Sequence, residues 1–315
     1  MKLSRILMTG LLLAGLTQAA DVQPQLYADG DDGSRYLALK PSKDSESYKW
    51  LQEHGRPLKV SELTLVQLPS QFDNRENCSP VWDQQHLGAC TGFASKSAAE
   101  LVWNIGAPEQ KDQFLASALF QYWNERSFEG TTDQDSGATI ADAIRALKQF
   151  GIAPDADWDY SDYAQRYLLK PSDQAFVDAK KHMDLDNIGH AEIAQSAEAI
   201  KTALVSKHAV IIGISVYESF MSPLTAKTGL VSMPNTVTEK LLGGHALLVV
   251  GYDDENKWYV VKNSWGEKWG DQGYCYIPYG YMHNAAFTSE IWGIGKMGPA
   301  GSAYGWYNPW RWLGY

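Results

Sequence analysis

The chain has 315 residues, of which 44% are hydrophobic and 20% charged, and its formal net charge is −10. This composition is typical of a globular protein with length for one large domain or two modest ones. An acidic chain without a block of like charge has no basic arm for a nucleic acid, so we expect no nucleic-acid partner.

The first 20 residues have the pattern of a targeting segment. Lys2 and Arg5 precede an apolar run at 6–16, and small residues follow as far as Ala20. The run is too short to span a membrane as a stable helix, and the pattern is typical of a cleaved secretory signal. We therefore predict export through the inner membrane, to the periplasm or the medium, without stable membrane insertion.

Residues 21–66 differ from the rest of the chain. Short apolar stretches on both sides of the turn-rich sequence 29–33 predict a β-hairpin. A helix is expected to begin after Ser42 or Ser45 and to end at Gly55. A hairpin and a short helix cannot bury a core of their own, so this segment must dock on the remainder of the chain.

From about 80 to 185 the apolar spacing is helical. Helices are predicted from Cys90 to Gly106, over 114–126, and over 140–150, where Thr139 is a cap. From about 190 to 295, after a helix at 197–207 that Ser196 can cap, strands dominate. The predicted strands are 209–216, 245–252, 258–263, 273–277 and 290–294. A helical half followed by a strand half predicts an α+β protein with a cleft between the halves.

One predicted hairpin brings a histidine and an asparagine together. A four-residue loop joins 245–252 to 258–263. If Tyr252 pairs with Lys257, His245 faces Ser264 and lies beside Asn263, within the usual cross-strand distance. The same pattern also fits an ordinary polar pair at the end of a strand.

Cys90 allows two interpretations. Free cysteine is often a buried structural residue. A cysteine at a helix N-terminus beside an imidazolium is instead suited to be a nucleophile, because both neighbours favour the thiolate. The amide oxygen of Asn263 would then orient the imidazole of His245. The N–H of Cys90 and the amide of Gln84 or Gln85 would stabilise an oxyanion.

Three motifs resemble those of papain-like cysteine peptidases. They read SPVWDQQHLGACTGFAS around Cys90, GGHALLVVGYDD around His245, and KNSWGEKWGDQGYCYIP from Lys262. The resemblance covers roughly 68–295, in the family's order of Cys, His and Asn. It implies two subdomains, a helical left half and an antiparallel β-barrel-like right half, with the active-site cleft between them.

The resemblance also implies roles for individual residues. Cys90 is the nucleophile, His245 the general base and acid, Asn263 the residue that orients His245, and Gln84 the oxyanion-hole amide. The residues implied around the substrate are Ser136 and Gly137 as a strip for extended backbone, Gly244 on the cleft wall, and Trp265 as the indole covering the His–Asn bond. No cofactor and no metal are expected.

The sequence departs from the family at two positions near the nucleophile. Leu87 replaces a cysteine that normally anchors a disulfide, and Thr91 replaces the usual Trp. These departures suggest a secreted bacterial branch of the family. Cys78 and Cys275 lie at matched distances from the motif residues, so we expect a disulfide between them; two buried free thiols are the alternative.

The predicted function is that of a secreted cysteine endopeptidase, monomeric and made as a zymogen, which acts on protein or peptide substrates. Residues 21–66 are expected to be an inhibitory pro-segment of the peptidase domain 67–315, and a permanent element on the back of that domain is the alternative. The side chains expected to fill the substrate subsites are Tyr27, Tyr36, Leu39, Trp50 and Leu51. The aromatic tail 296–315 is expected to dock on the domain or to contact a partner.

Two other functions keep the same residues. One is a triad-bearing acyl or amide transferase, and the other is a catalytically silent binding protein on a peptidase scaffold. The spacing of Gln84 to Cys90 and the Asn263-Ser264-Trp265 sequence disfavour the first. The complete set of four catalytic side chains disfavours the second. The sequence leaves open the preferred substrate side chains and the choice between endo- and exopeptidase action.

Overall fold

The computed structural model describes residues 25–28, 34–54, 68–106, 108, 114–161, 163–182 and 188–296. The predicted targeting segment, the hairpin turn at 29–33, the helix end at Gly55 and nearly all of the aromatic tail lie outside these ranges. Within them, no helix combines the length and the apolar character needed to cross a membrane.

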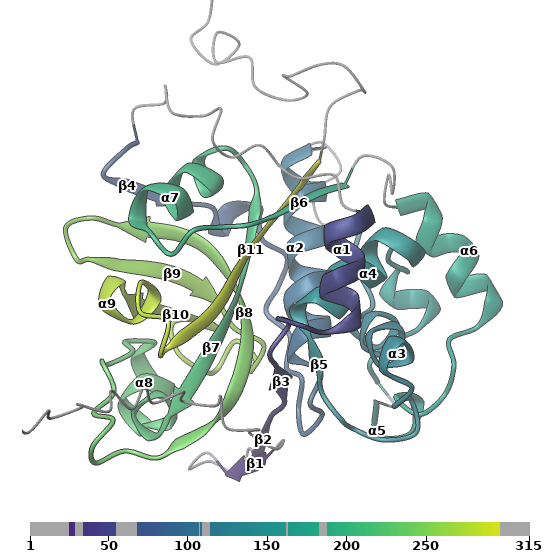
Figure 1. The fold of residues 1–315 in the computed structure, drawn as a ribbon, viewed down its shortest axis with the longest axis horizontal. Helices are drawn as coiled ribbons and strands as arrows, with labels where there is room; N and C mark the ends of the chain where they lie inside the picture. The colour runs from purple at the N-terminus through teal and green to yellow at the C-terminus, as the bar shows by residue number, and fades with distance from the viewer. Residues whose placement is uncertain are drawn as a thin grey trace, which may run out of the picture.

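Helices and sheet occupy separate halves, as the sequence predicts (Figure 1). The helical half contains α2 (Cys90–Gly106), α3 (Ala118–Glu129), α4 (Ile140–Phe150), α5 (Tyr163–Arg166) and α6 (Asp173–His182). Short 3-10 helices cover Arg75–Asn77, Asp155–Asp157 and Glu218–Met221. Three further helices lie on the sheet half: α7 (Ala197–Val205), α8 (Pro223–Thr228) and α9 (Tyr279–Met282).

The sheet half is antiparallel, with the strand order β10-β9-β8-β7-β11-β6 and with β4 added beside β8. The strands are β4 (Gln71–Asp73), β6 (Ile188–Glu192), β7 (Ala209–Tyr217), β8 (Leu241–Asp253), β9 (Trp258–Lys262), β10 (Tyr274–Pro278) and β11 (Thr288–Lys296). Among the described residues β6 and β10 remain edges, so the predicted barrel-like half is an open sheet.

Both faces of this sheet are buried, which explains the continuous apolar runs of its central strands. Ile211, Leu248 and their neighbours on one face share a core with α2. The alternate residues Val210 and Val249 share a second core with α7. Because α2 packs directly on the sheet, its first residue, Cys90, lies at the boundary between the two halves.

The predicted helix caps are present. The side chain of Thr139 accepts from the N–H of Asp142, whose carboxylate binds Thr139 in return, and Gly151 ends α4. Ser196 caps α7 in the same way. The prediction for α3 began too early, because Ser117 is its cap and residues before it are extended.

The predicted register of the β8–β9 hairpin is wrong. Asp253 pairs with Trp258 and Tyr252 with Tyr259, because Lys257 has a φ of 60° and belongs to the turn. An irregularity between Val249 and Gly251 then shifts the pairing by one residue.

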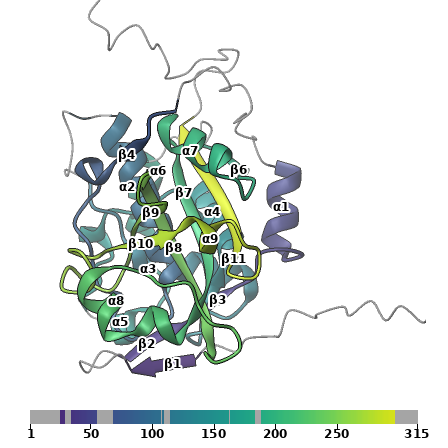
Figure 2. The same cartoon turned by 90° about the vertical axis from the view of Figure 1, so that its left-hand side faces the viewer.

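The N-terminal segment forms β1 (Gln25–Ala28), β2 (Ser34–Leu37), β3 (Leu39–Lys40) and α1 (Glu46–His54). Strands β1 and β2 pair as the predicted hairpin. Strand β3 leaves the hairpin and pairs in parallel with β5 (Ala138–Thr139) of the helical half. In Figures 1 and 2 the hairpin lies at one end of the molecule, with β3 rising from it between the halves.

The position of α1 corrects part of the subsite prediction. Ser45 receives the N–H of Tyr48 as the cap of α1, while Ser42 Oγ accepts from the N–H of Ala141. Leu51 is buried in the core that contains α4, and Trp50 packs against it with the guanidinium of Arg145 over its ring. Trp50 and Leu51 therefore anchor the segment on the domain and fill no subsite beside Cys90. The side chains of Tyr27 and Tyr36 lie outside the described part.

Candidate active site

Cys90 is the first residue of α2, and its side chain is fully buried. Burial raises the pKa of the thiol to about 12, whereas the backbone N–H groups of Ala246, Ala38 and Thr91 lower it by binding the thiolate. A lone thiolate is therefore unfavourable here, and forming it requires a base that becomes positively charged.

His245 is the candidate for that base. It lies on β8 directly before Ala246, and its Nε2 is 2.9 Å from Asn263 Oδ1. The indole of Trp265 stacks on the imidazole, with ring centroids 4.9 Å apart and an interplanar angle of 23°. The hairpin prediction thus paired the correct residues through an incorrect register. Trp265 is 2% exposed and contacts the imidazole face, as the resemblance implies.

Gln84 reaches the same place from the helical side. Its side chain is buried, and its Nε2 donates to the carbonyl of Leu87 at 2.9 Å. Its Oε1 accepts from the hydroxyl of Ser264 at 2.6 Å, so one N–H of the amide remains available for another acceptor. Gln85 is only half-buried, which favours Gln84 of the two candidates.

Ser264 is a residue that the sequence analysis missed. Besides holding Gln84, it donates its backbone N–H to Asn263 Oδ1 at 2.8 Å. One residue therefore fixes both the side-chain amide of Gln84 and the amide of Asn263, which is bonded to His245. Its position between Asn263 and Trp265 in the third motif was the available signal.

A buried ionic network joins the two halves beneath the site. Lys96 and Glu100, on successive turns of α2, form a 2.7 Å ion pair with side chains 1% and 0% exposed. Ser79 donates to Glu100 and receives Lys262 Nζ at 3.1 Å. Because Lys262 directly precedes Asn263, this network anchors the third motif to α2, the helix that begins at Cys90.

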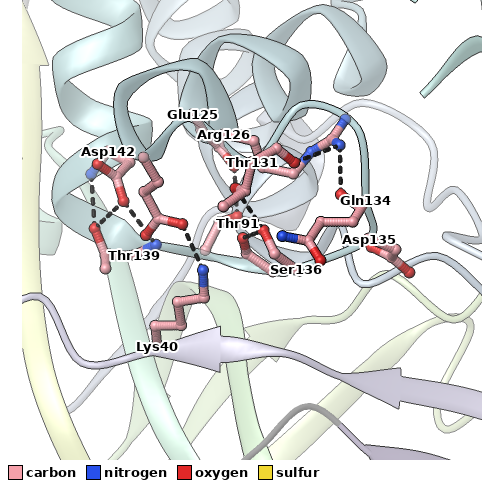
Figure 3. A network of polar contacts seen from close by, with 12 residues as sticks. Lys40, Thr91, Glu125, Arg126, Thr131, Gln134, Asp135, Ser136, Thr139 and Asp142 are labelled. Atoms are coloured by element: carbon pink, nitrogen blue, oxygen red, sulfur yellow. Dashed lines mark hydrogen bonds and ion pairs between the residues drawn. The ribbon is translucent and has the colours of Figure 1, made fainter. Parts of the chain in front are cut away.

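Thr91, which departs from the family, binds a buried carboxyl group. Its hydroxyl donates to Glu125 Oε2 at 2.5 Å, and Ser95 donates to Oε1 at 3.4 Å (Figure 3). Burial raises the pKa of Glu125 to about 8, so the group is mostly neutral at pH 7. No local pattern on α3 distinguishes Glu125, which explains why the sequence analysis missed it.

The N-terminal segment passes between two glycines at the boundary of the halves. A Cβ on Gly137 would lie 1.9 Å from the carbonyl oxygen of Ala38, and one on Gly244 would lie 2.7 Å from that of Leu39. Gly137 also has a φ of +67°. Both positions thus need glycine for an extended backbone to approach. The backbone N–H of Ala38 faces the thiol of Cys90 between them.

The strand pairing lies two residues beyond the predicted strip of Ser136 and Gly137. Leu39 pairs with Ala138, and Lys40 with Thr139. Ser136 instead turns inward: its hydroxyl is 2.8 Å from that of Thr131 and donates to the carbonyl of Gly137 at 3.0 Å.

An ion pair fastens this segment to the helical half. Lys40 Nζ binds the carboxylate of Glu129 at the end of α3 (Figure 3). Burial raises the pKa of Glu129, and the ammonium of Lys40 opposes that rise. The segment therefore contacts both halves, through backbone pairing and through a charged side chain.

The predicted Cys78–Cys275 disulfide is wrong, because the structure leaves all three cysteines as free thiols. Alternation along β10 explains the difference. Tyr274 faces Cys78, so Cys275, the next residue on the strand, points to the opposite face and is buried in the other core.

Comparisons with known proteins agree with this geometry. Residues 68–292 match the family described as papain family cysteine protease. An uncharacterised peptidase C1-like protein of Acanthamoeba polyphaga mimivirus is 37% identical over 68% of this chain and 69% of its own length. A cathepsin L-like peptidase of Aedes aegypti is 29% identical over 69% of this chain, which spans 61% of that relative.

Solved structures show the same fold. Xylellain, a cysteine protease from Xylella fastidiosa, superposes with a TM-score of 0.70 at 29% identity, over 88% of this chain and 99% of its own. Digestive procathepsin L 3 of Tenebrio molitor superposes with a TM-score of 0.58 at 18% identity, over 82% of this chain and 83% of its own. Given these matches and a cysteine, histidine and asparagine in the family's order, the chain belongs to the papain family of cysteine proteases.

Proposed function

We propose that this protease is a secreted endopeptidase, made as a zymogen, in which Cys90, His245, Asn263 and Gln84 carry the chemistry. One observation supports it most: Leu39 and Lys40 pair as a strand with Ala138 and Thr139, and the backbone N–H of Ala38, directly before them, faces the thiol of Cys90. A backbone held there by strand pairing occupies the place that an extended peptide substrate would need. Export rests on residues 1–20 of the sequence alone.

The catalytic steps follow from which atoms are engaged. His245 Nε2 is bound to Asn263, so Nδ1 is the nitrogen that takes the proton of the Cys90 thiol. The thiolate attacks the peptide carbonyl and forms a carbon–sulfur bond. The oxyanion accepts hydrogen bonds from the backbone N–H of Cys90, at the start of α2 where such groups lack helical partners, and from the Gln84 amide.

Collapse of this intermediate breaks the peptide bond. The imidazolium of His245 returns its proton to the leaving amine, and the acyl group remains on Cys90 as a thioester. Water, deprotonated by the neutral imidazole, then attacks the thioester and releases the carboxylic acid product. Asn263 and Trp265 hold the imidazole in one orientation throughout.

The N-terminal segment blocks these steps in the chain as folded. Ala38 is 2% exposed and Leu39 9% exposed, so both are covered on either side by the domain. As part of the same chain, the segment needs only modest contacts to remain bound, because tethering gives it a high effective concentration. Cleavage between α1 and the domain would let it dissociate.

A peptide blocked at both ends tests the proposed activity. Under reducing conditions, chain lacking residues 21–66 should cut an N-acetylated, C-amidated octapeptide at an internal bond, while the unprocessed chain does so slowly. An exopeptidase would leave this peptide intact and cleave only the unblocked version. Products coupled to an added amine, in place of free acids, would instead identify a transferase.

A further inference from the structure

Three pieces of chain meet at the carboxylate of Asp135, on the helical side of the site. The backbone N–H of Gly88, two residues before Cys90, donates to both carboxylate oxygens at 3.0 and 3.1 Å. The hydroxyl of Tyr122, on α3, also donates to Asp135. One half-buried carboxylate thus holds the loop before Cys90 and the helix α3.

Tyr122 extends this connection to the backbone strip. Its hydroxyl oxygen accepts the N–H of Gly137 at 2.9 Å. Gly137 directly precedes Ala138, which pairs with the extended segment over Cys90. A chain of hydrogen bonds therefore runs from Gly88 through Asp135 and Tyr122 to the strip where extended backbone binds.

The ring of Tyr122 is itself held in place. The guanidinium of Arg126 lies over it, 4.2 Å from its centroid. Arg126 also donates to the carbonyls of Thr132 at 3.2 Å and Gln134 at 2.7 Å, and Figure 3 shows it turned toward this loop. The loop that carries Asp135 is therefore fixed by a fully buried cation and by hydrogen bonds.

These contacts lie next to a position where the sequence lacks the cysteine of a family disulfide. Leu87, the residue before Gly88, replaces the cysteine that anchors a disulfide in the family, and it packs with Tyr122 in one apolar cluster. We propose that Tyr122 and Asp135 are positioning residues that form a noncovalent clasp, which holds the strip 137–139 at a fixed distance from Cys90 for binding extended peptides.

The clasp predicts a specific kinetic effect. This prediction rests on the endopeptidase function proposed above. The printed hydrogen bonds of Tyr122 and Asp135 join the strip at Gly137 to the loop at Gly88. Loosening the strip should therefore weaken the alignment of long substrates and leave the reactive pair intact. A general loss of folding would instead reduce activity on every substrate alike.

The test compares two substrates in the active enzyme. One is a blocked octapeptide, and the other is a small activated ester of a single amino acid, which is too short to pair with the strip. For Tyr122→Phe we expect KM for the octapeptide to rise about tenfold, because the hydroxyl's hydrogen bonds with Asp135 and Gly137 are both lost, with kcat little changed. The ester kcat/KM should stay unchanged.

Further variants make the result decisive. Tyr163→Phe is the matched control, since its ring stacks on Tyr160 in the same half and lies outside the clasp. Asp135→Asn keeps an accepting oxygen and should raise KM for the octapeptide less than Asp135→Ala does. Tyr122→Phe combined with Asp135→Asn should raise KM for the octapeptide no more than the single change with the larger effect, because both break one chain of contacts.

Two results would overturn the clasp. Equal losses of kcat/KM on the octapeptide and the ester in Tyr122→Phe and Asp135→Asn would show that these side chains only support the fold. Unchanged KM in both variants would show that the strip needs no clasp. Failure of the proposed function would appear separately, in the unsubstituted enzyme, as ester hydrolysis without cleavage of the octapeptide.

Discussion

The hydroxyl of Ser264 donates a hydrogen bond to the amide oxygen of Gln84 at 2.6 Å, across the boundary between the sheet half and the helical half. The backbone N–H of Gln84 in turn donates to the carbonyl of Ser264 at 2.8 Å. With Ser264 also bound to Asn263, the proposed oxyanion donor and the residue that orients His245 share one support. Their alignment should therefore depend on this serine.

Ser264→Ala should lower kcat roughly tenfold, with a smaller change in KM, because the Gln84 amide loses the bond that fixes its rotation. The measurement is steady-state hydrolysis of a blocked peptide. Ser206→Ala, which removes a hydroxyl bonded within α7, is the control and should have no effect on kcat. An unchanged kcat in Ser264→Ala would show that Gln84 is held by its other contacts alone.

Lys96→Gln should destabilise the fold by about 3–5 kcal/mol, because it leaves the carboxylate of Glu100 buried without its charged partner. Chemical denaturation measures the free energy of unfolding. Lys181→Gln breaks an ion pair in which the lysine is 61% exposed, and it should change stability by no more than ~0.5 kcal/mol. Similar effects of the two substitutions would contradict the role given to the buried network.

Glu125→Gln should make stability less dependent on pH. The pKa of Glu125 rises from 4.5 to about 8 on burial, so the folded protein holds a proton that the unfolded chain releases between these values. Stability from this group is fully present below about pH 4.5 and is lost as the pH rises through about 8.

The measurement is the free energy of unfolding at pH 5.5 and pH 9. The difference between the two values should be smaller in Glu125→Gln than in the unsubstituted protein by a few kcal/mol at most, since one pKa unit corresponds to about 1.4 kcal/mol. Equal differences in the two proteins would mean that Glu125 is ionised in the fold throughout this range.

Lys40→Glu should raise the activity of the unprocessed chain several-fold. It replaces the ion pair with Glu129 by two like charges, so the segment over Cys90 binds less tightly. Combining it with Glu129→Lys restores opposite charges and should restore latency. The measurement is the initial rate on a blocked peptide before any processing. Increased activity that the second substitution does not reverse would place the effect elsewhere.

The local sequence was a good guide to elements and a poor guide to contacts between them. The capping box at Thr139 and Asp142 and the glycine after α4 are short-range signals, and the helix formed as predicted. The β8–β9 register failed by two residues because Lys257 adopts a left-handed conformation, which the sequence of the turn did not indicate.

Contacts between distant segments were beyond the sequence. Tyr122, Glu125 and Asp135 have ordinary helix and loop surroundings, and only tertiary packing brings them to the nucleophile. The disulfide prediction failed for a related reason. The spacing in the sequence suggested that Cys78 and Cys275 lie near one another, but strand alternation points Cys275 to the other face of the sheet. The residues proposed for catalysis could be predicted because they lie in three dense motifs.

We propose that Cys90 is the nucleophile of an endopeptidase that its own N-terminal segment covers. The most direct test is the rate of octapeptide cleavage by Cys90→Ala and by the unsubstituted protein, each with residues 21–66 present and removed. We predict cleavage by the unsubstituted protein that increases once the segment is gone, and none by Cys90→Ala in either form. Comparable cleavage by Cys90→Ala would exclude Cys90 as the nucleophile.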